Sequence, residues 1–136
     1  MTGKVINETV RLANIAPIMF RKALTDVQIE GYTIPAGWSV IVCPAAVHLN
    51  PDIYKDPLAF NPWRWKNDGA YKYFMAFGGG MRFCAGADFS KMQMAVFLHY
   101  LVTEYRWRVV NGGKIVRTPD LAFPDGFHVQ IKAKGC

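Results

Sequence analysis

The sequence predicts a single α+β domain with two main helices, several short strands and a long irregular connection. Helical patterns occur near the start of the 136-residue chain and after Gly86, while alternating β-branched runs lie between them and again at the end. The length suits one core. Because 51% of the residues are hydrophobic and only 19% are charged, part of the surface is expected to be covered by something else.

The first half of the chain is expected to hold one helix and several strands. Apolar residues recur at helical spacing from Val5 to about Ala16, and Pro17 then marks the end of this helix. Residues 27–34 and 38–42 alternate, are rich in β-branched side chains and are separated by a Pro-Ala-Gly turn. These two stretches predict the strands of a small sheet.

The second half is expected to hold a loop, a helix and a hairpin. Between Pro44 and Gly69, several prolines and Asp and Asn residues predict a packed meander with short helical turns. The helix after Gly86 continues to about Thr103 and is apolar on nearly every face, so it should be buried. Residues 106–134 alternate around glycine turns and predict strands.

Charge and cysteine content narrow the possible functions. The net charge of +6 comes from scattered Lys and Arg, which favours a solvated basic surface over nucleic-acid binding. Cys43, Cys84 and Cys136 are odd in number and widely spaced, which argues against a disulfide framework or a zinc site. No apolar run reaches the ~20 residues of a membrane span, and no signal peptide is present, so this chain is expected in the cytosol.

The most informative segment is the glycine-rich stretch around Cys84. It has the pattern F-x-x-G-x-R-x-C-x-G, formed by Phe77, Gly80, Arg82, Cys84 and Gly86. Five fixed positions at residue frequencies of ~5% each would coincide by chance about once in several million windows. The pattern therefore indicates a specific chemical site.

Each residue type in this segment has a chemical reason. The unpaired N–H groups of the following helix favour the thiolate form of Cys84, which is the form that binds haem iron. The glycines allow positive φ angles and let the backbone approach a flat macrocycle, with amide groups free to point at the sulfur. The planar guanidinium of Arg82 suits a haem propionate, at roughly 1.5–3 kcal/mol, and Phe77 can shield the sulfur from water. The alternative is an inert, buried cysteine beside a glycine hinge.

This loop resembles the cysteine loop of the cytochrome P450 family. Residues 8–11 (Glu-Thr-Val-Arg) resemble the family's E-x-x-R helix, and residues 60–65 (Phe-Asn-Pro-Trp-Arg-Trp) resemble its F-x-P-x-R motif. The resemblance implies the C-terminal portion of the mainly α P450 fold: E-x-x-R helix, small sheet, meander, cysteine loop, long buried helix and C-terminal β-hairpin. It also implies a buried network of Glu8, Arg11 and Arg64, although Glu8 and Arg11 alone would equally suit a surface i,i+3 pair.

The resemblance also implies a haem cofactor with Cys84 as its axial ligand and catalytic centre. The residues implied to bind the cofactor are Phe77, Gly80, Arg82, Cys84, Gly86 and Arg21. For Arg21, a solvated position on a strand edge is the alternative. The residues implied to contact substrate are Ala16, Ile18, Met19, Leu121 and Ala122, of which the last two could instead be the apolar tip of a hairpin.

The sequence is similar to those of plant cytochrome P450 members that oxidise sterols, brassinosteroids and triterpenoids. A complete enzyme of this kind is expected to be a monooxygenase of lipophilic substrates that uses O₂ and receives electrons from NADPH through NADPH-cytochrome P450 reductase. Lys72 and Lys91 would belong to the basic face that attracts this reductase, with an ordinary solvated surface charge as the alternative for each lysine. The full-length family works at the cytosolic face of the endoplasmic reticulum membrane.

Residues 1–136 resemble only the last part of such a domain. No segment matches the family's distal A/G-G-x-D/E-T-T helix, and the membrane anchor and most helices of the family have no counterpart in the chain. A truncated, catalytically inactive haem-binding remnant is therefore the alternative to a monooxygenase. A basic module that binds RNA or a partner protein is a third hypothesis, although no known motif supports it.

Overall fold

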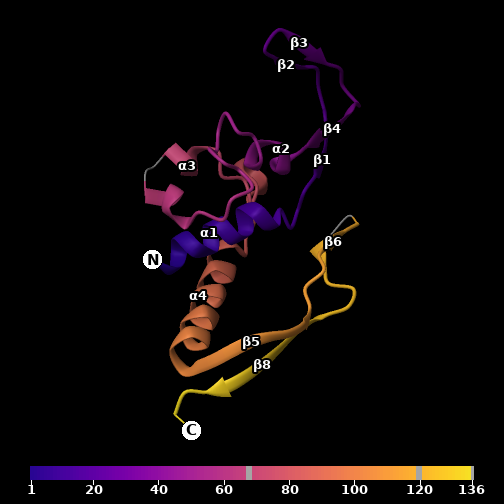
Figure 1. Ribbon diagram of the computed structural model, residues 1–136. Coiled ribbons are helices and arrows are strands. Elements are labelled where there is room, and N and C mark those ends of the chain that lie inside the picture. Colours follow the sequence, from indigo (N-terminus) through magenta and orange to yellow (C-terminus); the bar gives the residue numbers. More distant parts are fainter. Residues whose placement is uncertain (67–68, 119–120, 136) are drawn as a thin grey trace.

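A computed structural model describes residues 1–66, 69–118 and 121–135 (Figure 1). The helices are α1 (Thr2–Ala13), α2 (Pro44–His48), α3 (Gly69–Lys72) and α4 (Ala87–Glu104), with 3-10 turns η1 (Pro62–Lys66) and η2 (Gly80–Arg82). The strands are β1 (Met19–Lys22), β2 (Val27–Ile29), β3 (Tyr32–Ile34), β4 (Ser39–Val42), β5 (Tyr105–Gly112), β6 (Val116–Arg117), β7 (Leu121–Ala122) and β8 (Phe127–Ala133). The α+β class and the order of elements are as predicted. None of the helices in these ranges is long and apolar enough to cross a membrane.

Helix α1 ends earlier than predicted. The sequence placed its end near Ala16, whereas Asn14 already has left-handed backbone angles (φ 42°) and donates its N–H to the Val10 carbonyl at 3.1 Å. Asparagine tolerates this conformation better than most residues, so it closes a helix as glycine commonly does. The predicted end was wrong because it relied on Pro17, a strong sequence signal for the end of a helix. Asparagine at a helix C-terminus is a much weaker signal.

The strands of the first half form two separate pairs and not the single small sheet that was predicted. Strand β2 pairs with β3, and β4 pairs with β1, which the sequence pattern did not predict. Figure 1 shows both pairs along one arm that extends away from α1. All four sheets among the described residues are two-stranded and antiparallel.

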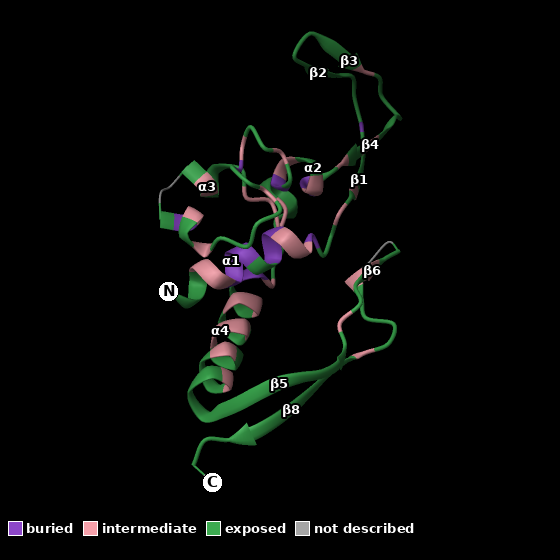
Figure 2. Cartoon of the chain, viewed as in Figure 1, coloured by how far each residue is buried: buried purple, intermediate pink, exposed green. Residues whose placement is uncertain are grey.

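The core lies between α1 and the meander (Figure 2). Its largest fully buried side chains are Trp65, Arg11, Tyr54, His48 and Glu8, so polar groups occupy much of it. No buried side-chain nitrogen or oxygen among the described residues lacks a hydrogen-bond partner. A core of this kind is specified by its hydrogen bonds as much as by apolar packing.

Helix α4 has the predicted bounds, but the expectation that it is buried was wrong for this chain. Of its 18 residues, all of them described, only Ala87 is buried, while Phe89 and Phe97 are 64% and 63% exposed. Among the described elements, the helix packs mainly against α1 and β5. The chain exposes 10185 Å², whereas a compact monomer of 15.3 kDa exposes about 7,100 Å². The apolar faces are thus uncovered.

The C-terminal hairpin is tied to the end of α1 by one side chain. Arg117 in β6 donates from Nη1 to the Asn14 carbonyl at 2.7 Å and from Nη2 to the Ala13 carbonyl at 2.6 Å. A cation at a helix C-terminus satisfies carbonyls that lack intrahelical partners and interacts favourably with the helix dipole. Arg117 therefore connects two parts of the chain that are about 100 residues apart in the sequence.

Candidate functional site

The cysteine loop is a tight backbone turn that presents Cys84 just before α4. The Cys84 N–H donates to the Phe77 carbonyl at 2.9 Å, which closes the loop at its base. Within it, Gly78 and Gly80 have φ angles of +78° and +63°, which side chains other than glycine's rarely allow. The glycines are required here by backbone conformation.

Within the chain, the space beside Gly79 and Gly80 is open. An added Cβ at Gly79 or Gly80 would meet no atom within 4 Å, and one at Gly86 would lie 3.9 Å from the Cys84 sulfur, an ordinary contact. The open space at Gly79 and Gly80 is compatible with a flat ligand lying against the loop.

The Cys84 side chain is exposed, as is that of Cys43, the other cysteine in the described part of the chain. The first turn of α4 follows directly, and the Ala87 N–H donates to the Cys84 carbonyl at 3.2 Å. The dipole of α4, 18 residues long, remains as a source of positive potential near the sulfur. Cys136 lies outside the described residues.

A cavity of about 470 Å³ adjoins Cys84. The cavity is lined by Val10, Ile15, Ala16, Met19, Met75, Ala76, Phe77, Gly78, Arg82, Cys84, Ser90, Gln93 and Met94. Most of these side chains are apolar, and Arg82 supplies the cation. Five residues singled out in the sequence meet here: Ala16, Met19, Phe77, Arg82 and Cys84.

The remaining predicted site residues do not line this cavity. Gly80 and Gly86 lie in the loop behind it, and Ile18 is an exposed neighbour of Met19. Arg21 is also outside the cavity, and its Nη1 donates to the Phe20 carbonyl at 2.8 Å. Leu121 and Ala122 form β7 and do not line the cavity either. Their roles toward cofactor and substrate stay predictions.

The cavity suits the group that the cysteine loop implies. It combines an exposed sulfur, an apolar lining and a guanidinium, and these are the three features that an iron porphyrin with carboxylate arms requires. Arg82 forms no ion pair with any residue that the structure describes, so its fork of N–H groups is available to a carboxylate. Cys84 would hold the iron and Arg82 a propionate.

Behind the cysteine loop, Glu8 is the centre of a buried polar network. Its carboxylate accepts from Arg11 (Nε at 3.0 Å and Nη2 at 2.8 Å), from Arg64 Nε at 2.9 Å, from Trp65 Nε1 at 2.9 Å and from the Asn61 N–H at 3.0 Å. Burial alone would raise the pKa of Glu8, but the hydrogen bonds from Arg11, Asn61 and Arg64 and the Arg11 charge outweigh it and lower the pKa to about 2. Glu8, Arg11 and Arg64 are thus brought together, with Trp65 as a fourth member.

An aromatic chain connects this network to the cysteine loop. The Trp65 ring centroid lies 4.9 Å from that of Phe74, and the Phe74 centroid lies 6.5 Å from that of Phe77, both in edge-on geometry. Phe77 in turn lines the cavity with Cys84. The network and the loop are thus joined by contacts between aromatic side chains.

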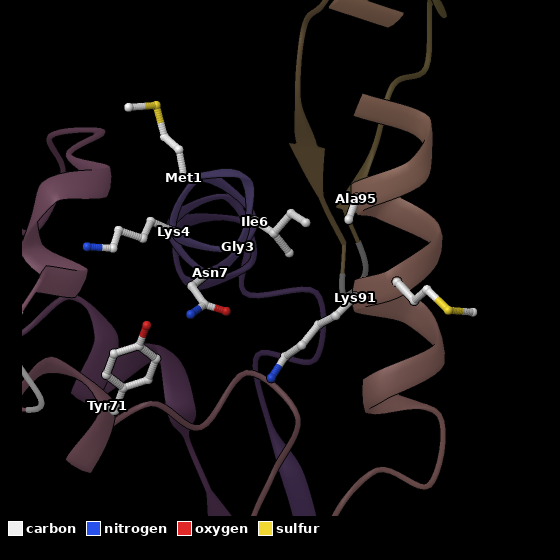
Figure 3. Close-up of a pocket in the computed structure, with 9 residues that line it drawn as sticks. Met1, Gly3, Lys4, Ile6, Asn7, Tyr71, Lys91 and Ala95 are labelled. Atoms are coloured by element: carbon white, nitrogen blue, oxygen red, sulfur yellow. The ribbon is translucent and has the colours of Figure 1, made fainter. Parts of the chain in front are cut away.

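A second hollow of about 450 Å³ lies between α1, α3 and α4 (Figure 3). Figure 3 shows Lys91 reaching from α4 toward the side of the hollow where Asn7 and Tyr71 lie. The Lys91 ammonium also lies 5.2 Å from the centroid of the Phe77 ring, a cation–π contact. This hollow therefore adjoins the cysteine loop from behind.

An exposed cysteine ahead of a long helix, at a cavity that also holds an arginine, is the arrangement of a haem-thiolate protein. Residues 1–132 match the family model described as Cytochrome P450, and the chain belongs to this family, whose cofactor is haem. Among its relatives, Cytochrome P450 87A3 of Oryza sativa subsp. japonica is 66% identical over 98% of this chain, and Cucurbitadienol 11-hydroxylase of Siraitia grosvenorii is 48% identical over 98%. The chain spans 27% and 29% of the length of these two proteins.

A solved structure agrees with this assignment. The chain superimposes on the structure titled "Retinoic acid bound cyanobacterial CYP120A1" with a TM-score of 0.83 and 31% identity, over 96% of this chain and 32% of that one. The predicted P450 fold fragment is thus confirmed.

Sequence reasoning missed four residues whose hydrogen bonds join distant segments around the site: Trp65, His48, Asn14 and Arg117. Trp65 follows Arg64 directly in the motif at residues 60–65, and this position could have indicated that it belongs to the same network. A lone histidine, a helix-end asparagine and an arginine in a short strand carry no comparable pattern.

Proposed function

We propose that the complete protein is a haem-thiolate monooxygenase that hydroxylates a lipophilic substrate of the sterol, brassinosteroid or triterpenoid class. The observation that carries this proposal is the exposed Cys84 sulfur at the wall of a cavity that Arg82 also lines. A relative named Cucurbitadienol 11-hydroxylase supports hydroxylation of a triterpenoid-type substrate. In this proposal, residues 1–136 form the proximal, haem-binding part of one P450 domain.

The chain's own residues bind and orient in this proposal. Cys84 supplies the axial sulfur, Arg82 anchors a propionate, and Phe77 limits the access of water to the sulfur. Thiolate-ligated haem supplies the activation of molecular oxygen when it is bound. The apolar residues Ala16 and Met19, which line the same cavity, would favour a lipophilic substrate.

Electrons would come from NADPH through NADPH-cytochrome P450 reductase, at the cytosolic face of the endoplasmic reticulum membrane. Lys91 lies behind the cysteine loop and Lys72 ends α3, so both are placed to contribute to a positive potential near the site. Such a potential would steer an acidic partner toward this face and make the association sensitive to salt.

Replacing Cys84 with serine should abolish the spectrum of thiolate ligation. Haem-reconstituted protein, reduced and exposed to carbon monoxide, is expected to give a red-shifted Soret band in the wild type. Cys43→Ser is the matched control, because Cys43 is also exposed but does not line the cavity, and it should retain the band. The ligand assignment is wrong if wild type and Cys84→Ser give identical spectra.

A haem-binding chain without turnover is the second candidate, because residues 1–136 span less than a third of their relatives. We expect no NADPH-dependent product from these residues with added reductase. Product formation by a longer protein that contains them, together with the thiolate spectrum in both, would support the monooxygenase. Absence of product from both would favour the inactive alternative.

A further inference from the structure

His48 is fully buried and both of its ring nitrogens have partners. Nδ1 lies 2.8 Å from Asn14 Oδ1, and Nε2 lies 3.0 Å from the backbone nitrogen of Met75. These partners come from two distant segments, the end of α1 and the backbone that leads into the cysteine loop. The carbonyl of His48 is held as well, because Arg11 Nη1 donates to it at 2.6 Å.

The partners decide the protonation state of the ring. A backbone N–H can only donate, so Nε2 must accept and carries no proton. The ring proton then lies on Nδ1 and is donated to the amide oxygen of Asn14, an assignment made from the hydrogen-bond network. A doubly protonated His48 would place N–H against the N–H of Met75 and lose that hydrogen bond.

Met75 is close in the chain to the reactive loop. Its carbonyl accepts the Gly78 N–H at 2.9 Å, and both Met75 and Phe77 line the Cys84 cavity. On the other side, Asn14 is fixed by its left-handed backbone and by Arg117, which holds its carbonyl. His48 therefore bridges a fixed helix end and the first residues of the loop.

We propose that His48 is a positioning residue for the cysteine loop, whose neutral Nδ1–H tautomer fixes the Met75 backbone relative to the end of α1. The consequence for haem ligation rests on the function proposed above, whereas the bridge itself does not. His48 contacts no cavity-lining side chain through its ring nitrogens and acts through the main chain. Asn14 is the partner of its other ring nitrogen.

The groups around His48 keep it neutral. Arg11 is the charged group in direct contact with His48, and it is itself paired with the carboxylate of Glu8. The ring centroid of Tyr54 lies 6.3 Å from that of His48 in edge-on geometry, and that of Phe74 lies 5.8 Å away in stacked geometry. Burial first, and then the Arg11 charge, lower the pKa of His48 to about 4. Burial raises the pKa of Tyr54, so its hydroxyl stays neutral and adds no charge.

Two substitutions separate the two halves of the bridge. Glutamine reaches as far as Nε2, so His48→Gln can still accept from the Met75 N–H, whereas His48→Asn reaches only as far as Nδ1 and keeps the donor to Asn14. We expect amide hydrogen exchange at Met75 to be near wild type in His48→Gln and roughly tenfold faster in His48→Asn. Equal exchange in the two variants would overturn the proposal.

Asn14→Asp tests the proposal through a pH dependence that would not change if His48 had only a structural role. A carboxylate beside Nδ1 stabilises the charged imidazole, so the pKa of His48 should rise. Protection of the Met75 amide should then be lost at a higher pH than in the wild type. An unchanged pH profile of Met75 exchange would contradict the assigned tautomer.

The spectrum of the haem-loaded protein links the bridge to the site. His48→Asn is expected to lose part of the red-shifted Soret band under carbon monoxide, and His48→Gln to retain it. If the wild type lacks this band while Met75 exchange responds as predicted, the proposed function fails and the bridge stands. If the band is present and Met75 exchange ignores both variants, only the bridge fails.

Discussion

Replacing Glu8 with alanine is expected to destabilise the protein by about 3–5 kcal/mol, because it leaves the fully buried guanidinium of Arg11 without its counter-charge. The same substitution removes the acceptor of Arg64 Nε, of the Trp65 indole and of the Asn61 backbone N–H. Domains have only about 5–15 kcal/mol of net stability, so this loss is a large share of the total. Urea denaturation followed by circular dichroism measures it.

Glu104→Ala is the matched control, because Glu104 is exposed at the end of α4 and its side chain forms no ion pair with the described residues. The control should change stability by less than about 0.5 kcal/mol. Glu8→Gln is a second variant with nearly the same volume, and its amide NH₂ would face donors. It too should destabilise the protein strongly. Comparable midpoints for Glu8→Ala and Glu104→Ala would refute a central role for the network.

The sequence predicted the reactive centre better than it predicted what holds that centre in place. The loop around Cys84 is local, because its glycines, arginine and cysteine are within ten residues and each type has a chemical reason to be there. The network of Glu8 with Arg64 joins residues 56 apart, and only resemblance to a family could propose it. Trp65 and His48 join it through tertiary contacts that no spacing rule encodes.

The strands and α4 also show that local sequence patterns do not predict contacts between distant segments. Alternation predicted extended chain within 27–34 and 38–42, where the structure has β2, β3 and β4. It did not predict that β4 pairs with β1, since pairing depends on partners elsewhere in the chain. The composition of α4 correctly indicated a helix but wrongly predicted its burial. Its exposure here reflects how little of the remaining chain lies against it.

The buried polar cluster also makes stability depend on pH, and lowering the pH from 7 to 3 should destabilise the protein in two steps. The pKa of His48 is about 4 in the folded protein against 6.5 ordinarily, and that of Glu8 is about 2 against 4.5. Between pH 6.5 and 4 the unfolded chain therefore binds a proton at His48 that the folded chain does not. Folding stability falls as the pH falls through that window.

Glu8 adds the second step between pH 4.5 and 2, in the same direction, because the unfolded carboxylate protonates first. Each lowered pKa corresponds to roughly 3 kcal/mol of stability that is fully present above the ordinary pKa of its group. Urea midpoints measured at pH 7, 5 and 3 would show the two steps. His48→Gln should remove the loss between pH 6.5 and 4 and leave the lower step intact. A wild-type slope that persists in this variant would assign the upper step to another group.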